Sequence, residues 1–106
     1  MIQKSIVEYL NYHSNVAWVE RMNVGCHLIN EKNSRRYIRY AFVGCSDILG
    51  QLKNGQLLAI EVKSATGVLS ESQREFINKV NTNGGVAFVA RSIDDVEINL
   101  KKCCKI

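Results

Sequence analysis

The first half of the chain changes from a helical to an extended pattern of apolar residues. Apolar side chains recur at helical spacing through 2–13, which predicts an amphipathic helix. Runs rich in β-branched and aromatic residues at 16–22, 37–43 and 57–63 predict strands. A shorter apolar stretch, 48–52, comes before the third of these runs.

The second half predicts two more helices around one further strand. Ser70 is followed three residues later by Gln73, which is the spacing of a capping box, so a helix is expected to begin there. The wholly apolar run 86–90 is typical of a strand that is covered on both faces, and 93–102 predicts a last helix. The resulting order, α-β-β-β-α-β-α, predicts an α/β fold with a mixed β-sheet flanked by helices.

Length and composition point to one domain over residues 1–106. The chain has no proline and no linker-like tract. No apolar run approaches the roughly 20 residues that span a bilayer, and the N-terminus lacks a signal-peptide pattern. We therefore expect a cytoplasmic protein without membrane contact. None of the four cysteines forms a C-x-x-C pair, so free thiols are expected rather than a zinc site.

The segment Lys53-Asn54-Gly55 separates two apolar runs and predicts a β-hairpin. A two-residue loop would place Asp47 opposite Val62. A three-residue loop over 53–55, with Gly55 in the left-handed conformation, places Asp47 opposite Glu61. We predict the three-residue loop.

In that register two carboxylates lie side by side. Like charges directly opposite each other destabilise a sheet, and their burial costs more unless something compensates. A hard divalent cation such as Mg²⁺ prefers carboxylate oxygens and is the natural compensator. Lys63 shares a face with Glu61, where an ammonium can stabilise developing phosphate charge. The alternative is that Glu61 and Lys63 are an exposed pair on a sheet edge.

These motifs occur in a fixed order. They are Arg21-Met22-Asn23-Val24-Gly25, Gly44-Cys45-Ser46-Asp47-Ile48-Leu49-Gly50, Leu58-Ala59-Ile60-Glu61-Val62-Lys63 and Gly67-Val68-Leu69-Ser70-Glu71-Ser72-Gln73. The set resembles the VRR-NUC family of the PD-(D/E)xK nuclease superfamily, in its short stand-alone phage or prophage type, over nearly the whole chain. The resemblance implies a restriction-endonuclease-like core, Mg²⁺ or Mn²⁺ dependence and phosphodiester hydrolysis.

The resemblance also implies roles for individual residues. Asp47 and Glu61 would bind the metal, with the Val62 carbonyl as a further ligand. Lys63 would be catalytic. Gln73 resembles a glutamine of the family's active site, and this role is compatible with its place in the capping box.

The chain departs from the family pattern at two points. Ser46 replaces the proline of the superfamily's name, which is a common variation. The family often has a metal-binding glutamate on its first helix, and the candidates here are Gln3 and Glu8. Glu8 lies about 160° from the centre of the apolar stripe and should face solvent, whereas Gln3 lies about 60° from it. We therefore expect Gln3 to join the metal site, with lower metal affinity or without a second metal.

A basic cluster begins just before the predicted strand at 37–43 and continues into it. Within a net charge of +4, it consists of Lys32, Arg35, Arg36 and Arg39, with Tyr37 and Tyr40 interleaved. Cations offset phosphate charge and aromatic rings stack on unpaired bases, so these residues are candidates for DNA binding. The alternative is a solvated loop.

The resemblance to short family members also implies a homodimer that cuts branched DNA, including four-way (Holliday) junctions.

Three functions are therefore compared. The first is a metal-dependent, structure-selective DNA endonuclease. The second is a nucleic-acid-binding module that has the nuclease fold but little or no activity, which Gln3 in place of an acid would support. The third is a small structural or partner-binding protein in which the E-x-K pattern occurs by chance.

Overall fold

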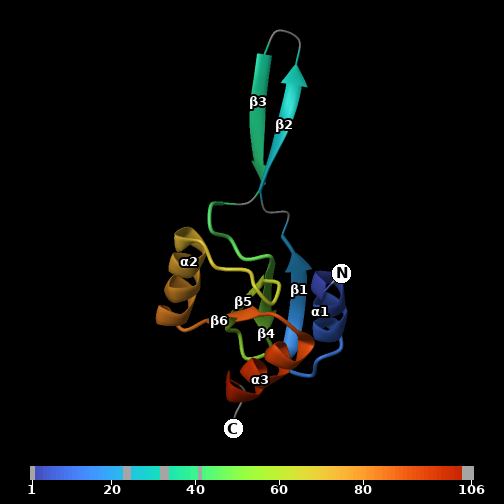
Figure 1. The fold of residues 1–106 in the computed structure, drawn as a ribbon. Coiled ribbons are helices and arrows are strands. Elements are labelled where there is room, and N and C mark those ends of the chain that lie inside the picture. The colour runs from blue at the N-terminus through green and yellow to red at the C-terminus, as the bar shows by residue number, and fades with distance from the viewer. Residues whose placement is uncertain (1, 23–24, 32–33, 41, 104–106) are drawn as a thin grey trace.

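A computed structural model describes residues 2–22, 25–31, 34–40 and 42–103, without the side chains of the second and third of these segments. Figure 1 shows the elements in chain order. They are α1 (Ile2–Asn11), β1 (Val16–Arg21), β2 (Gly25–Glu31), β3 (Ser34–Tyr40), β4 (Ile48–Leu52), β5 (Leu57–Val62), α2 (Glu71–Thr82), β6 (Val86–Ala90) and α3 (Ile93–Cys103). None of the described helices is long and apolar enough to cross a membrane.

The main sheet has four strands in the order β1-β4-β5-β6. Strand β4 is antiparallel to both of its neighbours, β1 and β5, and β6 runs parallel to β5. The parallel pair needs a crossover, which α2 provides between β5 and β6. This arrangement confirms the predicted α/β fold with a mixed sheet flanked by helices.

The sheet buries its two faces against different helices. Alternate positions of β4 and β5, such as Ile48, Leu58 and Ile60, belong to the large core cluster that also contains Ile6 of α1 and Leu100 of α3. The positions between them face α2 and form a smaller cluster, in which Ala59, Ala87 and Val80 are buried. The larger core therefore lies on the face covered by α1 and α3.

The prediction for the strand at 37–43 is wrong in both its bounds and its place. The strand that forms there, β3, covers 34–40 and pairs with β2 in a separate two-stranded sheet. Figure 1 shows this hairpin projecting away from the main sheet. Strand β2 was not predicted, because its Gly-Cys-His-Leu-Ile-Asn-Glu run has no strict alternation of apolar and polar residues. The strand that pairs with both β1 and β5 in the main sheet is β4, from the short stretch 48–52.

The β4–β5 hairpin has the predicted three-residue loop. The Leu52 N–H donates to the Gln56 carbonyl at 2.9 Å, and Gly55 has φ 98°. A side chain at that left-handed φ would strain the turn, so glycine fixes the loop length. The ladder pairs Ile48 with Ile60, and continuing it by one residue places Asp47 opposite Glu61.

Candidate active site

The site lies at the end of the sheet where the β4–β5 ladder stops. Asp47 directly precedes β4, and its carbonyl accepts a hydrogen bond from the Met22 N–H at 2.7 Å. Its Oδ2 accepts a second hydrogen bond from the Val62 N–H at 2.9 Å. The Asp47 carboxylate thus takes the place that a β4 carbonyl would otherwise fill, and the carboxylate is fixed against β5.

Glu61 is a buried carboxyl group with a strongly raised pKa. The side chains of Asp47 and Glu61 are both buried, with 7% and 2% of each residue exposed. The pKa of Glu61 is raised to about 8, first by burial and then by the charge of Asp47 and a side-chain hydrogen bond with it, while Lys63 acts in the opposite direction. Two buried carboxyl groups are therefore held together in a place that disfavours the negative charge of Glu61.

Two donors face the same oxygen of Glu61. Gln73 Nε2 donates to Glu61 Oε1 at 3.0 Å, and Lys63 Nζ lies 3.9 Å from that oxygen. The side-chain Oε1 of Gln73 accepts from the Ser70 N–H at 3.0 Å, while the backbone N–H of Gln73 donates to Ser70 Oγ at 3.2 Å. The predicted capping box is confirmed, and the same glutamine side chain also contacts the candidate site.

The donor set fits a divalent cation. Glu61 Oε2 is buried and has no hydrogen-bond partner among the described residues, so one carboxylate oxygen is available to a ligand. The N–H and C=O of one strand residue point to the same side, so the Val62 carbonyl lies on the edge that faces Asp47. Carboxylate and carbonyl oxygens are the donors that Mg²⁺ prefers.

The acidic cluster is small. Among the described residues, no group of three or more His, Cys, Asp or Glu side chains is arranged to hold a metal ion. A cation here would rest on two carboxylates and complete its shell with a carbonyl, an amide or water.

The two candidates on the first helix differ as expected in exposure. Glu8 is exposed and Gln3 is half-buried. In the part of the chain that the structure describes, no hydrogen bond joins Gln3 to Asp47 or Glu61. The N-terminal end of α1 lies beside the end of β1 in Figure 1, which is the end next to Met22 and Asp47. The role of Gln3 in metal binding stays a prediction.

Cys45 and Ser46 directly precede Asp47, and the sequence analysis placed them in a family motif without giving either side chain a role in the site. Burial raises the pKa of the Cys45 thiol, and the charges of Glu61 and Asp47 raise it further. The thiol is thus held neutral, and it donates to the Ser46 carbonyl at 3.4 Å. Ser46 Oγ is buried and has no hydrogen-bond partner among the described residues.

The predicted DNA-binding residues fall in the projecting hairpin. Arg35, Arg36, Tyr37 and Arg39 lie on β3, so they belong to a strand and not to a loop before one. Lys32 lies outside the described residues. The structure does not describe the side chains of this segment, and their contact with DNA stays a prediction.

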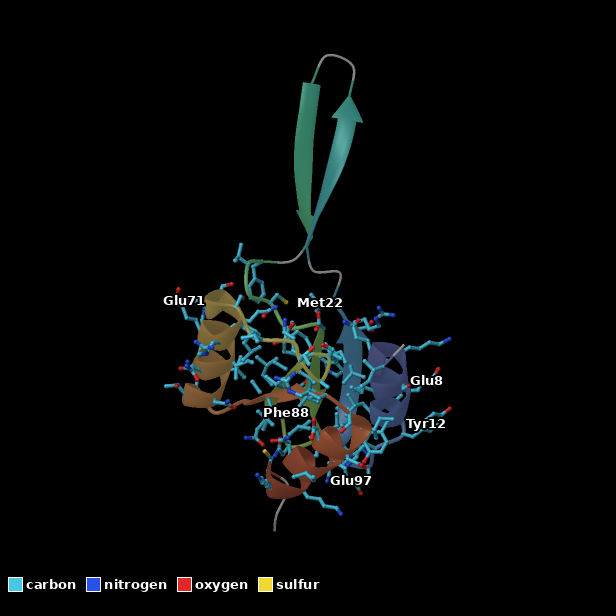
Figure 2. The ribbon with its side chains drawn as sticks, in the orientation of Figure 1. Glu8, Tyr12, Met22, Glu71, Phe88 and Glu97 are labelled. Carbon is cyan, nitrogen blue, oxygen red and sulfur yellow. The ribbon has the colours of Figure 1, made fainter. Side chains whose placement is uncertain are left out.

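Figure 2 shows where the candidate site lies relative to the projecting hairpin. Met22, next to Asp47, and Glu71, at the start of α2, both lie toward the end from which the hairpin projects. Phe88 and Glu97 lie further from that end. The carboxylates, the start of α2 and the base of the hairpin therefore share one end of the main sheet.

A mixed four-stranded sheet flanked by helices is consistent with a restriction-endonuclease-like fold. The VRR-NUC domain matches residues 1–94, and the chain belongs to the VRR-NUC family. No curated protein matches the chain. The VRR-NUC domain indicates a nuclease-type function, with DNA as the implied substrate.

Proposed function

We propose that this protein is an Mg²⁺- or Mn²⁺-dependent, structure-selective DNA endonuclease that acts on branched DNA such as four-way junctions. One observation carries the proposal. A buried pair of carboxyl groups contains an oxygen without a partner among the described residues, and Lys63 Nζ lies 3.9 Å from the other oxygen of the same group. Burial of a charged group costs free energy unless a partner compensates the charge. A divalent cation would supply that compensation here.

Each residue of the site has a distinct proposed role. Asp47, Glu61 and the Val62 carbonyl hold the divalent cation, with Gln3 as a weaker contributor. Such an ion supplies the charge that lowers the pKa of water and offsets the two carboxylates. Lys63 donates to the phosphate oxygens as their negative charge grows, and Gln73 fixes the orientation of Glu61.

The proposed DNA contacts lie on the hairpin, with Lys32, Arg35, Arg36 and Arg39 neutralising phosphates and Tyr37 stacking on unpaired bases. We also propose that the protein acts as a homodimer. A two-fold dimer presents two sites in symmetric relation, which suits paired nicks in a four-way junction.

A second candidate function is a nucleic-acid-binding module with little or no activity. It is favoured by the absence of a third acidic side chain from the described site. Calorimetry with Mn²⁺ separates the two functions. The nuclease proposal expects weaker binding to Asp47→Asn than to the wild type. Asparagine can still accept the Val62 N–H, so this change removes charge without breaking the fold. Equal titrations of the two proteins would favour the inactive module.

Cleavage of matched linear, flap and four-way DNA tests the activity directly, with Mg²⁺, with Mn²⁺ and with chelator. We expect Lys63→Ala to slow cleavage by about 100-fold or more while DNA binding is largely kept, because the ammonium acts on charge that develops in the transition state. The matched control is Lys79→Ala, an exposed lysine in the last turn of α2. If Lys63→Ala cuts as fast as the wild type, the catalytic role of Lys63 is wrong.

A further inference from the structure

The chain makes a short turn at residues 64–67, between Lys63 and α2. The side chain of Arg91 donates hydrogen bonds to this turn. The turn is closed by the Gly67 N–H, which donates to the Ser64 carbonyl at 3.2 Å. Arg91 Nη1 donates to the Gly67 carbonyl at 2.9 Å and also to the Ser64 carbonyl. One guanidinium nitrogen thus ties both ends of the turn together.

The turn lies close to the side chain of Lys63. A Cβ placed on Gly67 would lie 3.4 Å from both Cβ and Cδ of Lys63, and 3.2 Å from Ser64 Oγ. Residue 67 is therefore within about one carbon atom of van der Waals contact with the aliphatic part of Lys63. The side chain of Lys63 is only 20% exposed.

Arg91 is itself fixed by the main sheet and by α3. Its N–H donates to Asp95 Oδ2 at 2.8 Å, in the first turn of α3. The residue before it, Ala90, ends β6, and its carbonyl accepts from the Lys63 N–H at 3.1 Å. The backbone of Lys63 and the turn that covers its side chain are therefore held by consecutive residues, Ala90 and Arg91.

We infer that Arg91 is a positioning residue, which sets the Lys63 ammonium by holding the 64–67 turn against the lysine's aliphatic stem. A lysine side chain has four flexible carbons and loses substantial rotamer entropy when it is fixed in one place. Packing by the turn limits that freedom before DNA binds. The inference rests on the proposed function insofar as Lys63 acts on a phosphodiester.

A different role for Arg91 makes different predictions. Arg91 is exposed, so its guanidinium could instead contact a DNA phosphate. Loss of a phosphate contact weakens binding and lowers the salt slope by about one. Loss of a positioning contact lowers kcat and leaves KM and the salt slope unchanged.

The kinetic test compares Arg91→Met and Arg91→Lys with the wild type on a four-way DNA substrate. We expect both to lower kcat several-fold, up to about tenfold, with KM unchanged. Lysine keeps the charge but lacks the planar guanidinium that joins the two carbonyls, so Arg91→Lys should not restore the rate. The charge control is Lys102→Met, on an exposed residue of α3, which should cut like the wild type.

A double-mutant cycle connects the effect to Lys63. Adding Arg91→Met to Lys63→Ala should slow cleavage no further, because the group being positioned is already gone. Additive losses, or a loss confined to KM, would overturn the inference. Arg91→Lys, combined with Lys63→Ala in the same way, supplies a second route to the same result if Arg91→Met folds poorly.

A measurement without cleavage separates this inference from the proposed function. NMR relaxation of the lysine side-chain methylenes should show Lys63 more mobile in Arg91→Met than in the wild type, with Lys79 unchanged. Equal Lys63 mobility in the two proteins would overturn the inference, whether or not the wild type cuts DNA. If Lys63 mobility rises but the wild type cuts none of the substrates, the inference stands and the endonuclease proposal fails.

Discussion

The two faces of strand β5 are almost equally buried but differ in what burial does for the protein. Ile60 is 0% exposed and packs in the large core under α1 and α3. Glu61, the next residue, is 2% exposed on the face that α2 partly covers, beside Ala59 and a small apolar cluster. Burial of the isoleucine stabilises the fold, whereas burial of the carboxyl group opposes it. One face of β5 therefore stabilises the fold, and the other face carries the candidate active site.

The largest expected effect on stability lies on the apolar face. Ile60→Ala removes a fully buried side chain and should lower the free energy of unfolding by about 3 kcal/mol. Urea denaturation followed by circular dichroism measures it. Leu57→Ala, at a partly exposed position of the same strand, is the control and should cost less. Equal losses at the two positions would mean that the large core does not dominate stability.

On the face of β5 that holds Glu61, burial should lower the free energy of unfolding in the metal-free protein. The unfolded Glu61 has its ordinary pKa of 4.5 and the folded one about 8, so the folded state binds the extra proton between these values. The free energy of unfolding should therefore fall as pH rises through this window, at up to about 1.4 kcal/mol per pH unit. Glu61→Gln should remove that slope and be the more stable protein near pH 8.

Urea denaturation in chelator, repeated across this pH window, measures both slopes. Mn²⁺ should flatten the wild-type dependence, because a cation offsets the carboxylate charge, and it should leave Glu61→Gln nearly unchanged. Parallel pH profiles for the two proteins in chelator would contradict the raised pKa of Glu61.

The smallest effect is expected at Gln73, which belongs to the capping box of α2 and also contacts Glu61 in the candidate site. Gln73→Ala removes half of the capping box and should cost about 1 kcal/mol. It should also weaken Mn²⁺ binding, since Glu61 loses a donor that orients it. The control is Ser92→Ala, which removes the contact from Ser92 Oγ to the Asp95 N–H at the start of α3. A similar stability loss with unchanged Mn²⁺ affinity is expected there.

The parts of this design that could be predicted from sequence are set by neighbouring residues. Gly55 fixes the loop of the β4–β5 hairpin, and that loop fixes the register that brings Asp47 opposite Glu61. The Ser70–Gln73 spacing likewise predicts the start of α2. In each case the determining contacts span a few residues, so the local pattern is sufficient.

The parts that could not be predicted depend on partners distant in the sequence. Arg91 reaches a turn that lies 24 residues away from it at Gly67. Cys45 belongs to a loop without periodicity, and only the fold brings its thiol under the influence of Glu61. The β2–β3 pairing was missed for a related reason, since β2 has no strict alternation and its partner strand was predicted three residues too late.

The projecting hairpin makes the molecule about twice as long as it is wide, with extents of 59 by 28 by 28 Å. At 3.4 Å per base pair, a straight duplex parallel to the long axis would run beside the protein for about 17 base pairs. A footprint set by this length exceeds what the carboxylate site alone would protect. Removing the hairpin should therefore shorten the protected stretch of DNA before it changes the position of the cut.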